Sequence, residues 1–309
     1  MKKLTIVVPM YNEQEMIPLF FETINKVIEQ VENYETTLLC VDDGSKDDTL
    51  KLLKEQRQTQ KNLHIVALSR NFGHESAVCA GLKYASGDIV IVMDADLQDP
   101  PELILDLIKK YEEGYDVVNA KRVNRKKDPF LKRVTAEIFY WVIGKLSGKI
   151  KVPNNVGNFR LMSRRVVDYV NELAETNRVF RIEVPYVGFK TAEIEFVRPA
   201  RPKGESHYNY GSMIKLAGDS ITSSSIVPLR IAFTLGLIGI FVSFVCLITF
   251  YILYKCRLMS SLATVFSFIS LWGSLILFFI GIVGEYVGRT LLESQNRPIF
   301  YVDEEIKAE

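Results

Sequence analysis

Short apolar runs alternate with longer amphipathic stretches along the first 125 residues of the chain. The apolar runs predict β-strands at Leu4–Val8, Thr36–Val41, His64–Leu68, Asp88–Met93 and Asp116–Ala120. The amphipathic stretches predict helices over residues 13–32, 46–60, 74–86 and 101–113. Because the strands are almost continuously apolar and alternate with helices, this pattern predicts an α/β fold with a mostly parallel sheet and helices on both faces.

The second predicted helix begins with a capping pattern. Ser45 is followed three positions later by Asp48. A serine and a carboxylate at this spacing can satisfy the free N–H groups of a first helical turn. We therefore expect Ser45 to cap this helix.

The pattern changes near Pro228, after which charged residues become scarce. Residues 231–254 contain no charged side chain, and neither do residues 262–284. At about 1.5 Å per helical residue, each run is long enough to cross the ~30 Å hydrocarbon core of a bilayer. A buried core helix is the alternative, but two such runs separated by only seven residues predict a transmembrane hairpin with both chain ends on one side.

These changes in pattern divide the chain into four parts. We expect a soluble domain over residues 1–210, a juxtamembrane helix over 211–228, the hairpin over 229–288 and a tail over 289–309. The hairpin contains the small residues Gly236, Gly239 and Gly273, which could let it pack against a second copy of the chain.

Charge and cysteine content exclude some functions. The net charge is +1, from 38 basic and 37 acidic side chains, so no global field attracts nucleic acid. The four cysteines form neither a CxxC pair nor a metal-type cluster, and we expect them to be reduced thiols.

One basic cluster changes this picture locally. Residues 121–133 contain seven cations, and the apolar stretch Val134–Leu146 follows them. This order predicts a helix over about residues 130–147 that lies in the lipid headgroup layer, and a solvated charged face is the alternative. The residues expected at this surface are Arg125, Lys126, Lys132, Arg133 and Trp141.

Polar residues follow three of the predicted strands, at the sheet edge where ligands bind in such folds. They are Pro9-Met10-Tyr11-Asn12-Glu13, Asp42-Asp43-Gly44-Ser45 and Asp94-Ala95-Asp96. The first turn has no GxGxxG sequence, and GxxxxGK[ST] is also absent. These absences argue against a dinucleotide oxidoreductase and a P-loop phosphotransferase.

Residues 94–99 carry the sharpest chemical signal. Asp94 and Asp96 follow an apolar strand at i and i+2, and Asp99 adds a third carboxylate. Such a pair can share a hard divalent cation, whose open positions take diphosphate oxygens. The alternative is an acidic turn that caps the next helix, but three carboxylates in six residues favour a metal–diphosphate site.

Weaker signals lie elsewhere. A carboxylate of Asp42 or Asp43 could accept hydrogen bonds from a base or ribose, or both residues could simply form the turn before Gly44. In the second half of the soluble part, Asn158-Phe159-Arg160-Leu161 and the loop from Arg201 to His207 are candidates. That loop could close over a diphosphate, and an ordinary surface loop is the alternative.

Taken together, the motifs resemble those of family 2 glycosyltransferases. The matching segments are Val8–Glu13, Val41–Ser45, Ser69–Gly73 and Met93–Glu102. Within this family the chain is similar to the polyprenyl-phosphate sugar transferases, a group that includes bactoprenol glucosyltransferases and dolichyl-phosphate mannose synthases. Gly157–Arg165 and Gly284–Arg289 resemble the bactoprenol branch.

The resemblance implies a fold and a set of site residues. It implies a glycosyltransferase A-type nucleotide-binding domain that catalyses transfer with inversion. The nucleotide pocket would contain Pro9, Tyr11, Glu13 and Asp43, and the metal–diphosphate site would contain Asp94, Ala95, Asp96 and Gln98. Arg122 and Arg201 would reach the phosphates, and Gly204–Ser206 would form a lid.

Two positions depart from the family pattern. Asn158 stands where many relatives carry an aspartate, a proposed base, and His207 stands where relatives usually have lysine. An amide cannot accept a proton at neutral pH, so Asn158 is not a base. A neutral His207 would support the leaving diphosphate less than a cation does.

The resemblance therefore implies a membrane enzyme with catalytic residues Asp94, Asp96, Asn158 and Arg201. Its expected cofactor is Mg²⁺ or Mn²⁺, its donor UDP-glucose or UDP-N-acetylglucosamine, and its acceptor undecaprenyl phosphate. Because nucleotide sugars are cytosolic, the catalytic domain and both termini should be cytoplasmic, and the product should serve cell-envelope glycans. The alternatives are a mannose or modified pentose donor, or a catalytically silent membrane scaffold.

Overall fold

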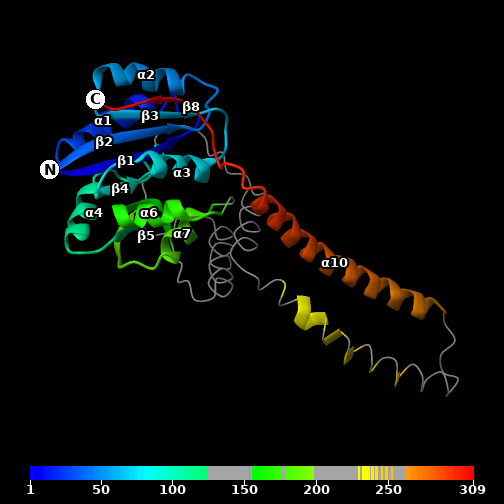
Figure 1. Cartoon of the computed structure of the whole chain (residues 1–309). Coiled ribbons are helices and arrows are strands. Elements are labelled where there is room, and N and C mark those ends of the chain that lie inside the picture. Colours follow the sequence, from blue (N-terminus) through cyan, green and yellow to red (C-terminus); the bar gives the residue numbers. More distant parts are fainter. Residues whose placement is uncertain are drawn as a thin grey trace.

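The structure is a computed structural model that describes residues 1–123, 153, 155–175, 178–197 and 262–309, together with scattered residues between 229 and 252 (Figure 1). The first 123 residues confirm the predicted alternation of strands and helices. The elements are β1 (Lys2–Met10), α1 (Ile17–Ile28), β2 (Tyr34–Asp42), α2 (Thr49–Thr59), β3 (Leu63–Leu68), α3 (His74–Tyr84), β4 (Ile89–Val92), α4 (Leu103–Glu112) and β5 (Val117–Val123).

The later elements were not predicted, apart from the helical nature of the second apolar run. They are β6 (Val156–Ser163), α6 (Arg164–Glu172), α7 (Phe180–Tyr186), β7 (Thr191–Val197), α10 (Leu262–Ser294) and β8 (Val302–Ile306).

The strands form one mixed sheet in the order β7-β5-β6-β4-β1-β2-β3-β8. The central strands β4, β1, β2 and β3 are parallel, as predicted. β6 runs antiparallel between β4 and β5, and β8 runs antiparallel beside β3. The carboxyl ends of β1 to β5 therefore lie along one edge of the sheet, and the chain enters β6 at that same edge.

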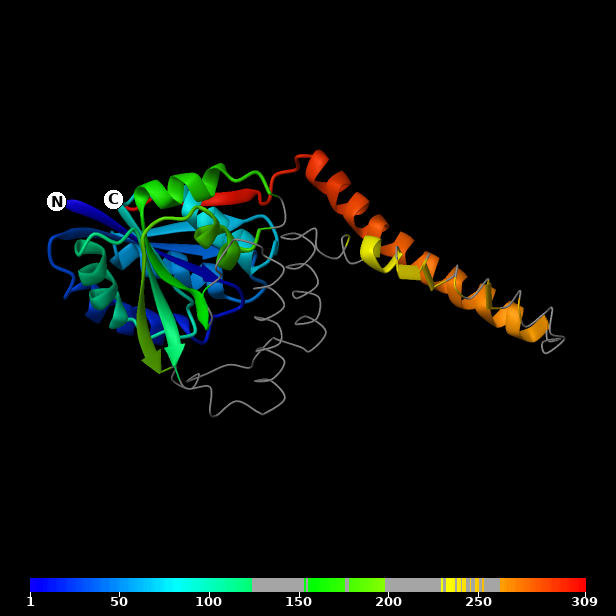
Figure 2. The same cartoon turned by 90° about the horizontal axis from the view of Figure 1, so that it is seen from below.

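The sheet separates two apolar cores. Alternate side chains of β1 point to opposite faces, so Ile6 joins one core and Val7 the other. The first core includes side chains of α1, α2 and α4, and the second includes side chains of α3, α6 and α7. Helices thus cover both faces, as predicted (Figure 2).

The predicted serine cap of the second helix is wrong. α2 begins at Thr49, and its N-cap residue, Asp48, makes no side-chain capping bond. Ser45 Oγ instead accepts a hydrogen bond from the backbone N–H of Asn12 at 3.0 Å. The serine is used for a contact between the loops that follow β1 and β2, and this long-range contact overrides the local pattern.

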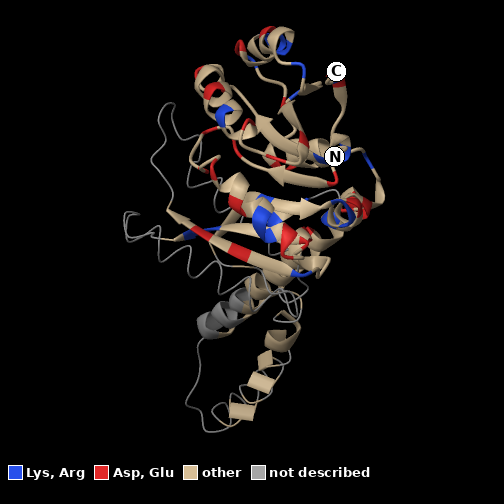
Figure 3. Cartoon of the chain, turned by 90° about the vertical axis from the view of Figure 1, so that its left-hand side faces the viewer, with Lys and Arg blue, Asp and Glu red and all other residues tan. Residues whose placement is uncertain are grey.

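The membrane-type helix α10 projects away from the sheet domain in Figure 1. Its residues Trp272–Ser294 are long and apolar enough to cross a bilayer. The described residues between 229 and 252 are also helical, and a Cβ on Gly239 would lie 2.7 Å from Cη2 of Trp272. The two apolar runs therefore touch within one chain. Figure 3 shows charged residues gathered on the sheet domain, with few on the described part of the projecting segment.

The chain returns to the sheet after α10. β8 pairs with the edge strand β3, and Ser69 N donates a hydrogen bond to Tyr301 O at 3.0 Å. Glu304 of β8 forms an ion pair with Lys54, and Oε1 of Glu305 lies 3.1 Å from Nε2 of His64. The tail, for which the sequence pattern predicted no element, thus joins the end of the projecting helix to the edge strand β3 of the sheet.

Candidate active site

The pairing of β4 with β6 brings together two residues that are far apart in the sequence. The register runs from Ile89 opposite Ser163 to Val92 opposite Arg160. Two further steps along each strand place Asp94 across from Asn158. His74, the first residue of α3, lies between them, with its Nε2 2.8 Å from Asn158 Nδ2 and 3.6 Å from Asp94 Oδ1.

Asp94 and Asp96 have the geometry of a partial cation site. Oδ1 of Asp94 is buried and has no hydrogen-bond partner in the protein, and Oδ1 of Asp96 accepts from the backbone N–H of Gln98 at 3.1 Å. Leu97 adopts a φ of 53°, which turns the chain sharply after these carboxylates. Among the described residues, no group of three histidine, cysteine or acidic side chains could hold a metal alone. A divalent cation therefore fits here if a ligand such as a diphosphate supplies further oxygens.

Arg122 is held beside this site by Asp99. Nη2 of Arg122 lies 3.2 Å from Oδ1 of Asp99, whose side chain is fully buried. The backbone N–H of Arg122 also donates to the carbonyl of Asn155 at 3.0 Å. A Cβ on Gly157 would lie 2.8 Å from Nη2 of Arg122, so glycine is needed for this close approach. The guanidinium is thus fixed at the carboxyl end of β5.

Asp43 connects two loops of the site. Its carboxylate oxygens accept hydrogen bonds from the backbone N–H groups of Phe72 at 2.7 Å and Gly73 at 2.9 Å. Burial raises the pKa of Asp43 above its ordinary value, although these two hydrogen bonds oppose the shift. The resemblance implies that Asp43 contacts a base or ribose, and this contact stays a prediction. In the structure the carboxylate also connects the loop after β2 to the loop after β3.

The carboxylate of Asp42, the residue before Asp43, has only one of its two oxygens hydrogen-bonded within the protein. Oδ2 accepts from the backbone N–H of Ser45 at 3.2 Å, whereas Oδ1 is buried without a hydrogen-bond partner. Burial also raises the pKa of Asp42. The nearby Gly44 has a φ of +63°, and a Cβ there would lie 2.3 Å from the carbonyl carbon of Arg70. This glycine lets the loops after β2 and β3 pack backbone to backbone.

The residues after β1 lie at the same edge. Pro9 is buried at the end of the strand, and Tyr11 and Glu13 are half-buried. The backbone N–H of Glu13 donates to Thr49 Oγ1 at 2.9 Å, and Asn12 between these residues has a φ of 53°. The loop is therefore held against the start of α2, with Tyr11 and Glu13 at the mouth of the site.

A buried arginine, Arg160, lies next to Asn158 in the interior of the domain. Arg160 follows Asn158 on the same face of β6, is 1% exposed, and donates to the carbonyl of Gly157 at 2.7 Å. Its guanidinium lies over the ring of Phe180, 4.7 Å from the centroid. Burial lowers the pKa of Arg160 to about 9.

Sequence reasoning did not select His74, Asp99 or Arg160 as site residues. A signal was available for His74, because it directly follows the Ser69–Gly73 motif at a strand end. For Asp99 and Arg160 the motifs that contain them were noted, but their partners are far away in the sequence. Seven predicted residues lie outside the described part of the chain, and their roles stay predictions: Arg125, Lys126, Lys132, Arg133, Trp141, Arg201 and His207.

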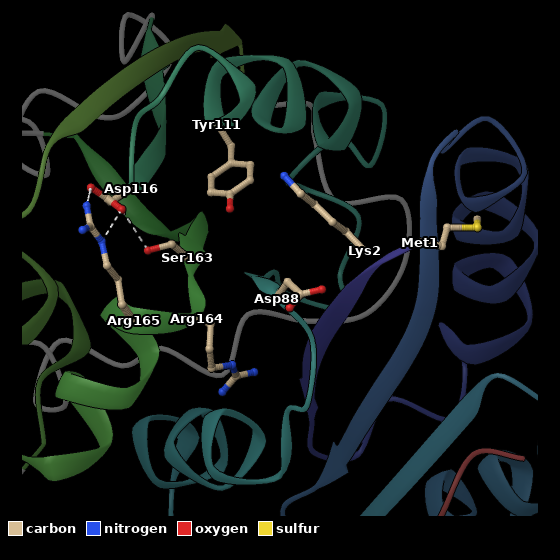
Figure 4. Close-up of a pocket in the computed structure, with 8 residues that line it drawn as sticks. All are labelled: Met1, Lys2, Asp88, Tyr111, Asp116, Ser163, Arg164 and Arg165. Atoms are coloured by element: carbon tan, nitrogen blue, oxygen red, sulfur yellow. Dashed lines mark hydrogen bonds and ion pairs between the residues drawn. The ribbon is translucent and has the colours of Figure 1, made fainter.

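A hollow lies at the opposite, amino-terminal edge of the parallel strands (Figure 4). It is open, encloses about 730 Å³, and is lined by Met1, Lys2, Asp88, Tyr111, Asp116, Ser163, Arg164 and Arg165. Arg165 is ion-paired with Asp116, and Arg164 donates to the carbonyl of Ala85. Its arginines are thus already partnered within the protein, and we assign no ligand to this hollow.

Comparison with known proteins identifies the family of the chain. The sequence model of glycosyl transferase family 2 matches residues 5–170. The bactoprenol glucosyl transferase of Shigella phage SfV is 39% identical over 308 residues, covering 98% of this chain and 99% of the relative. A prophage bactoprenol glucosyl transferase homologue of Escherichia coli (strain K12) is 38% identical, covering 97% and 98%. An uncharacterised glycosyltransferase of Bacillus subtilis (strain 168) is 41% identical, covering 96% and 92%.

A solved structure supports the fold. Glucosyl-3-phosphoglycerate synthase from Mycobacterium tuberculosis, in complex with phosphoglyceric acid, is 18% identical and superposes with a TM-score of 0.50. The match covers 72% of this chain and 80% of that protein. The predicted glycosyltransferase A-type fold is therefore confirmed. The family match over more than half of the chain, the full-length relatives and this fold lead to one conclusion: the chain belongs to glycosyl transferase family 2.

Proposed function

We propose that this protein transfers a sugar, glucose or N-acetylglucosamine, from a UDP-sugar to undecaprenyl phosphate, with inversion at the anomeric carbon. One observation carries the proposal: similarity to bactoprenol glucosyl transferases extends over 98% of the chain and therefore includes its apolar carboxyl-terminal part. The positions of Asp94, Asp96 and Arg122 at the carboxyl ends of β4 and β5 support the proposal, because they could bind the donor diphosphate through a cation and a guanidinium.

In this reaction a phosphate oxygen of the acceptor forms a bond to the anomeric carbon of the sugar. The bond from that carbon to the UDP oxygen breaks, and UDP leaves with the electron pair. A phosphate monoester has a second pKa near ~6 and is largely dianionic at neutral pH. The acceptor is therefore already a nucleophile, which is compatible with an amide at position 158.

Residues of the chain would stabilise the negative charge on the UDP-sugar and on the acceptor phosphate. Asp94 and Asp96 would hold Mg²⁺ or Mn²⁺, which neutralises charge on the leaving diphosphate when bound. Arg122, fixed by Asp99, would contact a phosphate oxygen. Asn158 lies opposite Asp94 and would orient the acceptor phosphate by donating the amide hydrogen that His74 does not accept.

We further propose that the protein is a multi-pass membrane protein with a cytoplasmic catalytic domain. Support comes from the span-length helix α10 and from the contact between Gly239 and Trp272. β8 follows α10 and joins the catalytic sheet, so the end of α10 is on the side of the catalytic domain. A hairpin satisfies this connection, because it enters and leaves the membrane on one side, where the UDP-sugar is available.

The test is a product assay with the full-length protein in lipid bilayers. Radiolabelled UDP-glucose and UDP-N-acetylglucosamine are supplied with undecaprenyl phosphate and Mg²⁺ or Mn²⁺, and lipid-linked product is separated by thin-layer chromatography. Asp96→Asn should abolish product because it removes a charge from the cation site, and its amide oxygen can still accept the hydrogen bond from the Gln98 backbone N–H. Asp106→Asn, an exposed aspartate of α4, is the matched control and should be fully active. The absence of lipid product with both donors would contradict the proposed substrates, and a fully active Asp96→Asn would contradict the metal site.

A further inference from the structure

The loop between β3 and α3 has its backbone fixed at both ends. Ser69 N–H donates to Tyr301, which directly precedes β8, and the N–H groups of Phe72 and Gly73 donate to the carboxylate of Asp43. Gly73 has a φ of +97° and is the N-cap of α3. These contacts determine where His74, the first residue of the helix, enters the site.

The side chain of His74 lies between the two halves of the site. Its Nε2 accepts a hydrogen bond from Nδ2 of Asn158 at 2.8 Å, and the Asn158 residue is 3% exposed. The same nitrogen is 3.6 Å from the Asp94 carboxylate, without a hydrogen bond between them. Oδ1 of Asn158 is buried without a hydrogen-bond partner. Among the described residues, His74 is therefore the side chain that restrains rotation of this amide about its broad terminal torsion.

The position of His74 does not suggest a packing role. Its side chain is 40% exposed, and the start of α3 is already held by backbone hydrogen bonds to Asp43. Loss of the imidazole therefore leaves the apolar cores and the helix start intact. Its contacts instead run between a buried amide and a carboxylate of the cation site.

We propose that His74 is a positioning residue: its hydrogen bond holds the Asn158 amide in one orientation on the side of the site that faces Asp94. This inference rests on the proposed function, in which Asn158 orients the acceptor phosphate and Asp94 faces the donor diphosphate. By accepting one amide hydrogen of Asn158, the imidazole fixes the direction of the second amide hydrogen, which we assign to the acceptor phosphate. The acceptor oxygen is then aligned with the anomeric carbon, and a misplacement of about 1 Å is enough to cost about 100-fold in rate.

The experiment uses the full-length protein in bilayers and four variants. His74→Phe keeps the ring but loses both nitrogens, and His74→Gln keeps a polar group at nearly the position of Nε2. Asn158→Ala removes the target, and the fourth variant combines His74→Phe with Asn158→Ala. His64→Gln, at the far edge of the sheet beside Glu305, is the matched control and should behave as wild type.

We expect His74→Phe to lower kcat by about 10- to 100-fold. Manganese-dependent UDP affinity, measured by calorimetry, and Tm should stay close to wild type, because Asp94 and Asp96 are intact. His74→Gln should recover most of the rate. In the Asn158→Ala background, adding His74→Phe should cost less than about threefold, since coupled residues are not additive.

Three results would overturn the inference. They are a wild-type rate in His74→Phe, equal losses in the phenylalanine and glutamine variants, and a full additional loss in the double variant. If wild type forms no lipid product, the proposed function fails and this inference fails with it. If wild type is active and His74→Phe is unaffected, only the inference fails.

Discussion

The guanidinium of Arg122 is held by the fully buried carboxylate of Asp99, with Nη2 and Oδ1 3.2 Å apart. Arg122 is at the end of β5 and Asp99 follows β4, so this ion pair joins two strand ends that are not adjacent in the sheet. A carboxylate buried this deeply needs its cationic partner, and the partner in turn is held in one orientation. The pair therefore links the stability of the domain to the geometry of the diphosphate site.

This ion pair predicts that Asp99→Asn lowers the stability of the domain and also lowers the activity of the enzyme. The amide keeps the size of the side chain but loses the charge, and breaking a buried pair of this kind costs roughly 3–5 kcal/mol in the extreme case. We expect a lower Tm and a fall in kcat/KM of about 10-fold or more, as Arg122 loses its orientation. Thermal unfolding and the lipid-product assay measure the two effects, with Asp106→Asn as the exposed control. Wild-type values for both would show that Asp99 does not position Arg122.

Asn158→Asp tests whether the transferase needs a base. If the acceptor phosphate is already ionised, a carboxylate here adds repulsion of roughly 4 kcal/mol at ~4 Å and an effective dielectric constant of ~20, before shielding. We expect a raised KM for undecaprenyl phosphate and no gain in kcat. Asn158→Ala should lose orientation without adding repulsion.

A base mechanism predicts the reverse order. The aspartate variant would be clearly faster than wild type, and its rate would rise with pH through the carboxylate pKa. Rates of wild type and both variants between about pH 5.5 and 8 distinguish the mechanisms. A large gain for the aspartate variant would contradict the proposal that Asn158 only orients the acceptor phosphate.

The antiparallel pairing of β8 with β3 predicts that the tail stabilises the catalytic edge. Glu304 lies opposite Ala67 in the ladder. Lys61 and Ser69 of the β3 segment direct their backbone polar groups toward the tail, and Ala67 shares their alternation, so a proline at position 304 would remove a backbone donor from this pairing. We expect Glu304→Pro to lower Tm and to weaken UDP binding, because the loop that ends in Gly73 loses its support from Tyr301.

Glu304→Thr is the control for this prediction. It also loses the ion pair with Lys54 but retains the backbone donor and a residue that favours strands. Thermal unfolding and calorimetry with UDP compare the two variants. Equal effects would show that side-chain charge at position 304, not strand pairing, supports the edge.

Glu183 predicts a specific dependence of stability on pH. Burial raises the pKa of this carboxyl from 4.5 to about 7, although Arg178 lies 3.1 Å away and opposes the shift. Between these two values the folded protein binds more protons than the unfolded chain, so the free energy of unfolding falls as pH rises from 4.5 to about 7. The fall attributable to this group is roughly 3 kcal/mol.

Glu183→Gln should flatten that part of the stability profile, because the amide does not titrate. Its absolute stability can shift in addition, since Arg178 loses a charged neighbour. Tm of the full-length protein measured from about pH 4.5 to 8 reports the slope, and the exposed Glu22→Gln is the control. An unchanged slope in Glu183→Gln would assign the pH dependence to other groups.

Local pattern was sufficient for the first 123 residues. A strand such as Ile89–Val92 is apolar at every position because both faces of the sheet are covered, and the amphipathic α1 and α4 repeat with the period of a helix. The pattern located Asp94 and Asp96 correctly at a strand end. It was misleading for Ser45, whose hydroxyl bonds to a loop 33 positions away instead of capping its own helix.

The amino-acid pattern thus determined the elements of the first 123 residues, the helical nature of the apolar runs and the carboxylates that follow the strands. Burial and periodicity are local properties, and a short window of sequence contains them. The order of the strands is not local: β6 and β8 enter the sheet antiparallel after long intervals of chain, and their neighbours depend on which edges are left to pair. Only that folding places Asn158 against His74, Arg122 against Asp99, and Tyr301 against Ser69. The chemistry of the site was readable along the chain, but its geometry depends on contacts between residues that are 23 to 232 positions apart, for which periodicity has no signal.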